Sequence, residues 1–212
     1  MQNRQIIEPK RSIDVIHETD VLVVGSGPGG LSAAIASARC GVKTTLLERF
    51  GCFGGNITVV GVEGFAWYRH EKTVEAGGIG REFEELAKEM GAAVPESQSL
   101  SYELDSEGFK LVADKLVMDS GIHPMLHRSF SMPIMEGNTV IGVIVESKAG
   151  REAILSKVVI DATGDADVAF RAGAQLNTMP VEELMATSVM FHLAGVDKKA
   201  FLSEIQNNPQ SY

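Results

Sequence analysis

The hydrophobic residues near the N-terminus predict a strand, a helix and a second strand. A short apolar run, Asp20-Val21-Leu22-Val23-Val24, ends at Gly25, which is typical of a strand buried on both faces of a parallel sheet. Residues 29–39 are rich in alanine and are closed by Gly41, so they predict a helix. Residues 42–48 predict the second strand. The stretch 20–48 therefore reads as the βαβ opening of an α/β fold.

The middle of the chain predicts a long loop and two helices. Residues 49–76 are rich in glycine and have no clear period, and a loop of this length is usually functional or disordered. Residues 79–90 have the spacing of an amphipathic helix that ends at Gly91. A further helix is expected at 108–119, closed by Gly121. Residues 92–106 are polar and predict a loop. A short edge strand is expected earlier, around residues 13–16.

From residue 122 the hydrophobic period changes to two. Residues 122–135, 139–147 and 151–161 predict strands, and the sequences between them are typical of tight turns. This pattern predicts a β-meander. His123 and His127 lie on its first strand, where a structural role is expected for both. A helix over 166–172 follows, with Asp165 as its N-cap. Residues 186–194 predict a strand and residues 197–206 a helix.

A glycine motif lies between the first strand and the first helix. The sequence Gly25-Ser26-Gly27-Pro28-Gly29-Gly30 has glycine at each fixed position of G-x-G-x-x-G. The first glycine permits a tight turn, the second lets a pyrophosphate approach the backbone, and the third lets helix and strand pack closely. The pyrophosphate would then lie at the positive end of the helix dipole. The motif in this setting predicts a dinucleotide site.

Glu48 ends the second strand, 23 residues after Gly25. A carboxylate at this place can accept hydrogen bonds from the hydroxyls of an adenosine ribose. It also disfavours a ribose 2′-phosphate, which argues against NADP. The motif and this acid are common to NAD and FAD sites, so they leave both cofactors open.

Composition narrows the class of protein. The 212 residues carry a formal charge of −9, which makes nucleic acid an improbable partner. No apolar run is long enough for a membrane span, and no signal peptide is evident, so the expected location is the cytoplasm. Two cysteines predict no disulfide framework, and Cys40 is expected to be a small buried residue. The five histidines have no metal-ligand spacing, so no metal site is expected.

Two further segments have sequences that are typical of a known protein family. Arg49 is followed by Gly54-Gly55-Asn56, and the last predicted strand continues into Ala162-Thr163-Gly164-Asp165. Together with the glycine motif, these segments resemble FAD-dependent oxidoreductases with two dinucleotide-binding domains, related to the fumarate reductase flavoprotein group. The resemblance covers about residues 18–195. It implies an enzyme that transfers a hydride between a small organic substrate and flavin.

The resemblance also implies an architecture. We expect an α/β fold made of a Rossmann-like FAD-binding domain with an inserted β-meander and the beginning of a substrate domain. The expected domains are an arm at 1–19, an incomplete FAD-binding domain at 20–175 and the start of a substrate-binding domain at 176–212. The 212 residues alone are therefore expected to be inactive.

The motif, the ribose acid and the resemblance together assign a set of residues to FAD. They are Gly25, Ser26, Gly27, Pro28, Gly29, Gly30, Glu48, Arg49, Gly54, Gly55, Asn56, Ala162, Thr163, Gly164 and Asp165.

Catalytic residues are harder to assign. Arg69 and His70 are substrate-side candidates, because they follow the Gly54-Gly55 segment that should face the flavin. Cys52, His192 and the meander histidines are expected to be structural. An NAD-dependent dehydrogenase and a non-catalytic FAD-binding module are the alternative functions. The sequence also leaves open the assembly of the chain into a homo-oligomer.

Overall fold

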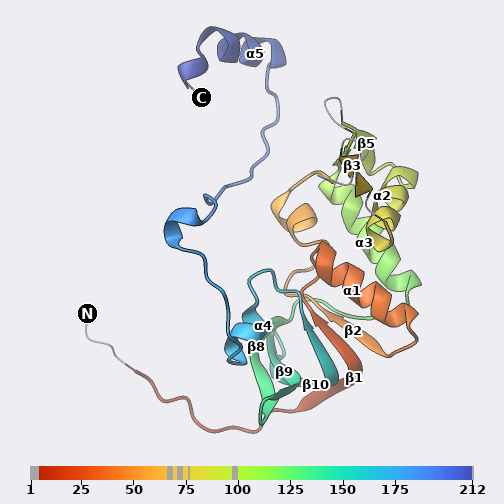
Figure 1. Cartoon of the computed structure of the whole chain (residues 1–212), viewed down its shortest axis with the longest axis vertical. Helices are drawn as coiled ribbons and strands as arrows, with labels where there is room; N and C mark the ends of the chain where they lie inside the picture. Colours follow the sequence, from red (N-terminus) through yellow and green to blue (C-terminus); the bar gives the residue numbers. More distant parts are fainter. Residues whose placement is uncertain (1–4, 66–68, 71–73, 76, 97–99, 212) are drawn as a thin grey trace. The chain divides into compact units, whose positions relative to one another are not determined.

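The computed structural model describes residues 5–65, 69–70, 74–75, 77–96 and 100–211 (Figure 1). The chain divides into two units, Met1–Met179 and Pro180–Tyr212. The strands of the first unit are β1 (Val15–Val24), β2 (Thr44–Leu47), β3 (Arg69–His70), β4 (Val74–Glu75), β5 (Ala93–Pro95), β6 (Tyr102–Leu104), β7 (His123–Met125), β8 (Ser129–Glu136), β9 (Thr139–Ser147) and β10 (Gly150–Asp161). Its helices are α1 (Pro28–Arg39), the π-helix η1 (Asn56–Val60), α2 (Ile79–Glu89), α3 (Ser106–Asp119) and α4 (Asp167–Arg171).

A six-stranded mixed sheet, in the order β7-β2-β1-β10-β9-β8, forms the centre of the first unit. The four strands β7, β2, β1 and β10 are parallel, whereas β9 is antiparallel to both of its neighbours, β10 and β8. The expected α/β class is confirmed. The predicted meander is present, but it is continuous with the parallel strands, because its last strand is also the neighbour of β1.

Strand β1 is longer than the apolar run predicts. The separate edge strand expected near residues 13–16 is wrong, since Val15 already begins the ten-residue β1 and pairs with Ala153 of β10. Polar residues such as His17 and Thr19 lie between the first residues of β1 and its apolar end, so the sequence does not show that both belong to one strand. Only the last four residues of β1, Val21–Val24, are flanked by strands on both sides, and only these are uniformly apolar.

The single strand predicted over 122–135 is also wrong, because the structure divides it into β7 and β8. The break lies at His127, whose φ of 55° is incompatible with a strand. His123 lies on a strand as expected, but this strand pairs in parallel with β2 and is not part of the meander. His127 and Arg128 lie in the turn.

Two apolar clusters cover the two faces of the sheet. On one face, α1, α2 and α3 pack over Val23 of β1 and Leu46 of β2. On the other face, Val168 of α4 joins Leu22 and residues of β7, β9 and β10. Alternate residues of β1 and β2 thus face opposite sides, as the pleat requires. The helices form where the sequence predicts them, at Pro28–Arg39, Ile79–Glu89 and Ser106–Asp119.

Short elements occupy two stretches that predict only loop. The polar segment 92–106 contains the antiparallel pair of β5 and β6. The glycine-rich segment 49–76 contains η1 and the pair of β3 and β4. Cys40, expected to be buried, is exposed because it is the C-cap of α1. Among the described residues, no helix has both the length and the apolar character needed to cross a membrane.

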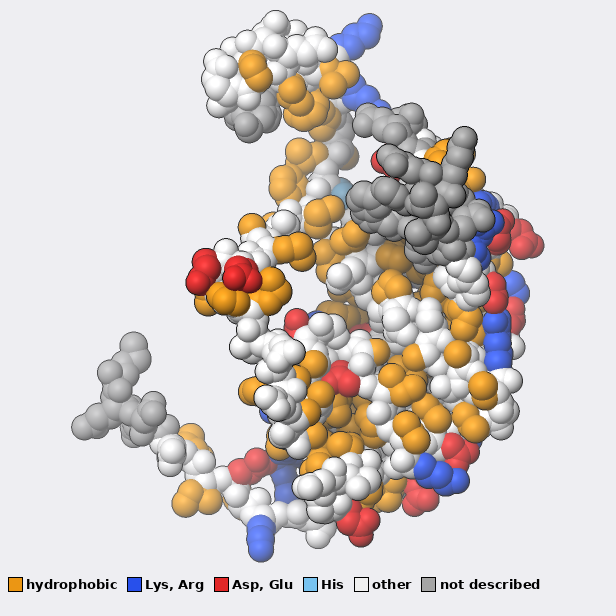
Figure 2. Space-filling model, viewed as in Figure 1, with side chains coloured by type: hydrophobic (Ala, Val, Ile, Leu, Met, Phe, Trp, Pro, Cys, Tyr) orange, Lys and Arg blue, Asp and Glu red, His pale blue; other side chains and the backbone are white. Residues whose placement is uncertain are grey.

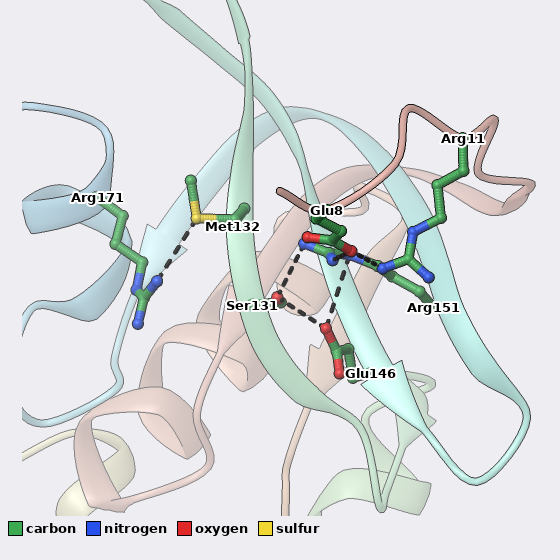
Figure 3. Close-up of polar contacts among 7 residues, drawn as sticks. All are labelled: Glu8, Arg11, Ser131, Met132, Glu146, Arg151 and Arg171. Carbon is green, nitrogen blue, oxygen red and sulfur yellow. Dashed lines mark hydrogen bonds and ion pairs between the residues drawn. The ribbon is translucent and has the colours of Figure 1, made fainter. Parts of the chain in front are cut away.

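The N-terminal arm is tied to the meander by ion pairs (Figure 3). Glu8 accepts a 2.9 Å bond from Arg151 of β10 and also pairs with Arg11. The Arg151 guanidinium additionally contacts Glu146 and Ser131. Because the acidic partners are exposed, these pairs orient the arm more than they stabilise the fold.

The second unit contains the 3₁₀ turns η2 (Val181–Glu183) and η3 (Pro209–Ser211) and the helix α5 (Lys198–Asn207). Asp197 caps α5 by accepting from the N–H groups of Lys199 and Ala200, so the predicted helix at 197–206 is confirmed. The strand predicted at 186–194 is wrong, because this described segment has no regular structure. Its apolar residues, which suggested a strand, are exposed (Figure 2).

His17 of β1 and His123 of β7 stack on each other, although β2 lies between these two strands in the sheet. The rings of His17 and His123 are 4.5 Å apart with planes inclined by 16°. His17 Nε2 also lies 2.9 Å from the hydroxyl oxygen of Thr45. Burial lowers the pKa of His17 below its usual value of 6.5, and the charges of His123 and Lys43 lower it further. His17 is therefore neutral in the folded protein at neutral pH.

This pair predicts a loss of stability in mild acid. Below pH 6.5 the unfolded chain binds a proton at His17 more readily than the folded chain, so the free energy of unfolding decreases as the pH decreases. Above pH 6.5 His17 is neutral in both states, so it no longer lowers the free energy of unfolding. The Tm difference between pH 7.5 and pH 5.5 should therefore be smaller in His17→Gln than in the wild type. His192→Gln, in the second unit, is the control, and an equal difference in all three proteins would contradict the expectation.

Candidate functional site

The glycine turn joins the end of β1 to the start of α1. Gly25 has a φ of +98°, and a Cβ added there would lie 2.3 Å from the carbonyl oxygen of Ala162. A Cβ added at Gly30 would lie 1.9 Å from the carbonyl oxygen of Gly25. Side chains are thus excluded at both positions by the protein's own backbone. These two glycines keep β1, α1 and the residues after β10 in close contact.

Gly27 differs from these two glycines because its surroundings are open. A Cβ added there would meet no described atom within 4 Å, and its φ of −60° is available to any residue. Gly27 is the N-cap of α1, and this fully described helix has neither a side-chain cap nor an acidic residue in its first turn. Free N–H groups and the positive end of the helix dipole therefore face an open space, which favours an anion.

Glu48 lies directly beside this turn and is almost completely buried. Its Oε2 atom accepts from the N–H of Ser26 at 2.9 Å and from the Ser26 hydroxyl at 2.6 Å. Its Oε1 atom accepts from the N–H of Phe50 at 2.9 Å. A carboxylate has about four acceptor positions. One position thus remains for a ligand hydroxyl while all three protein bonds are kept.

The loop after β2 returns to the glycine turn. The N–H of Gly54 donates to the carbonyl oxygen of Ser26 at 2.9 Å. Gly55 has a φ of +56°, and a Cβ added there would lie 2.7 Å from the Cα of Gly27. The π-helix η1 begins at the next residue, Asn56. Single π-turns are frequent at functional sites, and this one places Asn56 at the opening of the site.

The Ala162-Thr163-Gly164-Asp165 segment forms the opposite wall, and Asp161 organises it. The Asp161 carboxylate accepts from the N–H and hydroxyl of Thr163 and from the N–H of Ala169. The Thr163 hydroxyl accepts from the N–H of Asp167, the first residue of α4. The sequence predicts Asp165 as the N-cap of α4, and this prediction is wrong. The N-cap is Ala166, with a φ of 57°, and Thr163 and Asp161 bind the first N–H groups in its place.

These segments enclose one cleft of about 830 Å³. It is lined by every predicted cofactor residue except Gly54 and Asp165. The sequence did not assign several other lining residues, namely Phe50, Val59, Val60, Arg128, Ser129, Phe130, Asp161 and Asp167. Only the break between β7 and β8 could have revealed Arg128 to Phe130, and the pattern of 122–135 conceals it. The volume lies within the range of small-molecule and cofactor sites.

The substrate-side candidates cannot be placed in the cleft. The backbone of Arg69 and His70 forms β3, which pairs with β4. Their side chains lie outside the part of the chain that the structure describes. Among the described residues, no group of three or more His, Cys, Asp or Glu side chains is arranged to hold a metal ion.

Comparisons with known proteins agree with this geometry. The model of the family named FAD dependent oxidoreductase matches residues 20–211. A thiamine thiazole synthase from Metallosphaera sedula is 34% identical over 160 residues, which are 70% of this chain and 55% of that protein. One from Saccharolobus solfataricus is 33% identical over 162 residues, 71% of this chain and 57% of that protein. The chain thus spans about half the length of these curated relatives.

Solved structures share the fold. Thermovibrio ammonificans THI4 matches with a TM-score of 0.52 and 24% identity, covering 73% of this chain and 61% of that chain. A geranylgeranyl bacteriochlorophyll reductase-like protein from Thermoplasma acidophilum matches with a TM-score of 0.55 and 23% identity, covering 75% and 43%. At these identities the likeness supports the fold alone.

The expected family, fold class and cofactor are confirmed by the match that extends over residues 20–211. An NAD-dependent dehydrogenase and a non-catalytic module find no support in it. The chain belongs to the family of FAD-dependent oxidoreductases, which are enzymes that use FAD.

Proposed function

We propose that FAD binds in the cleft that joins the glycine turn, Glu48 and the Ala162–Asp165 segment. The pyrophosphate lies at the N-terminus of α1 beside Gly27, and the adenosine ribose donates a hydrogen bond to Glu48. The flavin half extends toward Gly55, Asn56 and the segment after β10. The observation that carries this assignment is the convergence of three distant segments on one cleft, each with groups suited to part of a dinucleotide.

The reaction that we propose is hydride transfer between a small organic substrate and the flavin. The bound cofactor supplies the redox chemistry at its flavin ring. The residues of this chain supply binding and orientation. N–H groups at the start of α1 hold the pyrophosphate, Glu48 fixes the ribose, and Asp161 keeps the Thr163 segment in place.

A direct test uses purified protein and a flavin titration. The protein should bind FAD with about one site per chain, and a protein that takes up no FAD would refute the binding assignment. Electron donors are then added without oxygen, and those to be compared are amino acids, small hydroxy acids and NADH. Loss of the visible absorbance of the bound flavin with one of them would support the proposed reaction and contradict the expectation that these 212 residues alone are inactive. Bound FAD that none of them reduces would agree with that expectation.

The curated relatives favour a second candidate function, the synthesis of the thiazole part of thiamine. Their identity of 33–34% extends over about 70% of the chain. This function can be distinguished by expressing the protein in a bacterial strain that requires thiazole for growth. Growth without added thiazole would favour the second candidate over simple hydride transfer.

Arg69 and His70 remain our candidates on the substrate side. An arginine can bind a substrate carboxylate, and a histidine can transfer a proton near neutral pH. Arg69→Ala and His70→Ala should therefore retain FAD, and at least one of them should slow flavin reduction by about 100-fold. The rates are measured by stopped-flow absorbance with the best donor found above. Wild-type rates in both variants would exclude this role.

A further inference from the structure

We propose that His127 is a positioning residue for Glu48. The turn between β7 and β8 holds the backbone of residues 48–51, and through this backbone it sets where the Glu48 carboxylate lies. The inference rests on the proposed binding of the adenosine ribose at Glu48. It adds a residue that lies outside the cleft lining and makes no contact with the carboxylate itself.

Three backbone hydrogen bonds join the turn to the Glu48 segment. The N–H of Glu48 donates to the carbonyl oxygen of Met125 at 2.9 Å. The N–H of Arg128 donates to the carbonyl oxygen of Glu48 at 3.0 Å, and the N–H of His127 donates to that of Phe50 at 3.1 Å. These bonds continue the pairing of β2 with β7 beyond the ends of both strands. The N–H of Glu48 is therefore held by the last residue of β7, and its carbonyl group is held by the turn.

The conformation of His127 makes this arrangement possible. Its φ of 55° is in the left-handed region, which non-glycine residues rarely adopt. Such a conformation persists only where the surrounding contacts determine it, and it is common near functional sites. With the strand interrupted at this residue, the successive N–H groups of His127 and Arg128 both bond to the segment after β2.

Side chains hold the turn at two further points. Arg128 Nε lies 3.2 Å from the Glu152 carboxylate on β10, which ties the turn to the central sheet. The imidazole of His127 lies against Gly51, where an added Cβ would be 2.6 Å from Cε1 of the ring. Gly51 thus provides the space that the ring occupies. The segment that carries Glu48 is fixed at its backbone by the turn and at Gly51 by the imidazole.

The position of the carboxylate depends on this support. Both oxygens of Glu48 are committed to N–H groups that are fixed in space, those of Ser26 and Phe50. Phe50 is in turn bonded to His127. A small displacement of the segment would therefore change the direction of the one acceptor position left for the ribose. We expect His127 to affect the adenosine half of the cofactor site and to do so through Glu48.

The test is a double-mutant cycle on FAD affinity at pH 8, with FAD itself as the probe. His127→Val places a β-branched residue in the left-handed region and should weaken FAD binding about tenfold, whereas His127→Asn, which tolerates that region, should stay within about threefold. Glu48→Gln should also weaken binding. The double variant His127→Val/Glu48→Gln should bind FAD within about twofold of Glu48→Gln alone, because His127 acts through Glu48.

Two further variants keep the test decisive. His123→Val lies at an ordinary strand position of β7 and should leave FAD affinity unchanged. Gly51→Ala displaces the imidazole from the other side, so it should weaken binding several-fold, and this loss too should vanish in the Glu48→Gln background. If His127→Val fails to fold, the FAD affinities of Gly51→Ala with and without Glu48→Gln test the positioning role of His127 in its place.

The possible results separate the two levels of the proposal. Additive losses in the cycle, with a normal effect of Glu48→Gln, would overturn the positioning role of His127 and leave the ribose assignment intact. An unchanged FAD affinity in Glu48→Gln would overturn the ribose assignment and this inference with it.

Discussion

Gly27→Val is expected to abolish FAD binding while the protein stays folded. The backbone at Gly27 has a φ of −60° and a ψ of 175°, which valine adopts without strain. A Cβ added there would meet no described protein atom within 4 Å, so we expect the valine methyl groups to occupy the space at the N-terminus of α1. This is the space that the pyrophosphate needs. We expect FAD affinity to decrease at least about 100-fold, or about 2.7 kcal/mol.

The matched comparison is Gly30→Ala in the same turn. A Cβ at this position would lie 1.9 Å from the carbonyl oxygen of Gly25 and 3.1 Å from the Cβ of Ala162. Gly30→Ala should therefore lower the Tm even without a ligand, whereas Gly27→Val should not. Circular dichroism and flavin titration of the two variants separate a binding defect from a folding defect. Full FAD binding by Gly27→Val would show that the pyrophosphate lies elsewhere.

Glu48→Gln is expected to weaken FAD binding by about tenfold to 100-fold, since one hydrogen bond to a charged group contributes about 1.5–3 kcal/mol. The substitution keeps the size of the side chain but replaces one acceptor oxygen by an NH₂ group. This group would face either the N–H of Phe50 or the N–H and hydroxyl of Ser26. The variant should therefore also unfold at a lower temperature.

Stability and affinity must be separated in this experiment. Titrations well below the Tm of Glu48→Gln measure FAD binding by folded protein alone. Glu107→Gln, an exposed position on α3, is the control for loss of one negative charge from an acidic chain. It should change neither Tm nor affinity. If Glu48→Gln retained wild-type affinity, Glu48 would be a structural residue of the glycine turn and not a ribose ligand.

The sequence predicts the binding turn well because local constraints determine it. The apolar run before Gly25, the alanine-rich helix and the acid at Glu48 each have a physical reason that depends on few neighbours. The structure adds a constraint that the sequence could not reveal. Gly25 is required by its contact with the backbone of Ala162, which lies more than 130 residues later in the chain.

The errors occur where distant contacts override the local pattern. The alternation over residues 122–135 predicts one strand, but the strand is interrupted at His127, where the backbone bonds to Glu48 and Phe50. Asp165 is of a residue type that is common at N-caps, yet Asp161 and Thr163 already bind the first N–H groups of α4. The apolar residues of 186–194 favour a strand, but this described segment has no regular structure.

The double role of β10 has a consequence for the order in which the protein can assemble. The meander of β8, β9 and β10 forms through tight turns, so its contacts are local and can form early. The pairing of β10 with β1 closes a chain segment of more than 120 residues, which is entropically slow. During synthesis, the glycine turn therefore leaves the ribosome long before its Ala162 wall exists. With FAD bound in the proposed cleft, we expect a nascent chain to retain it only after β10 is complete, and the cofactor would then stabilise the pairing that forms last.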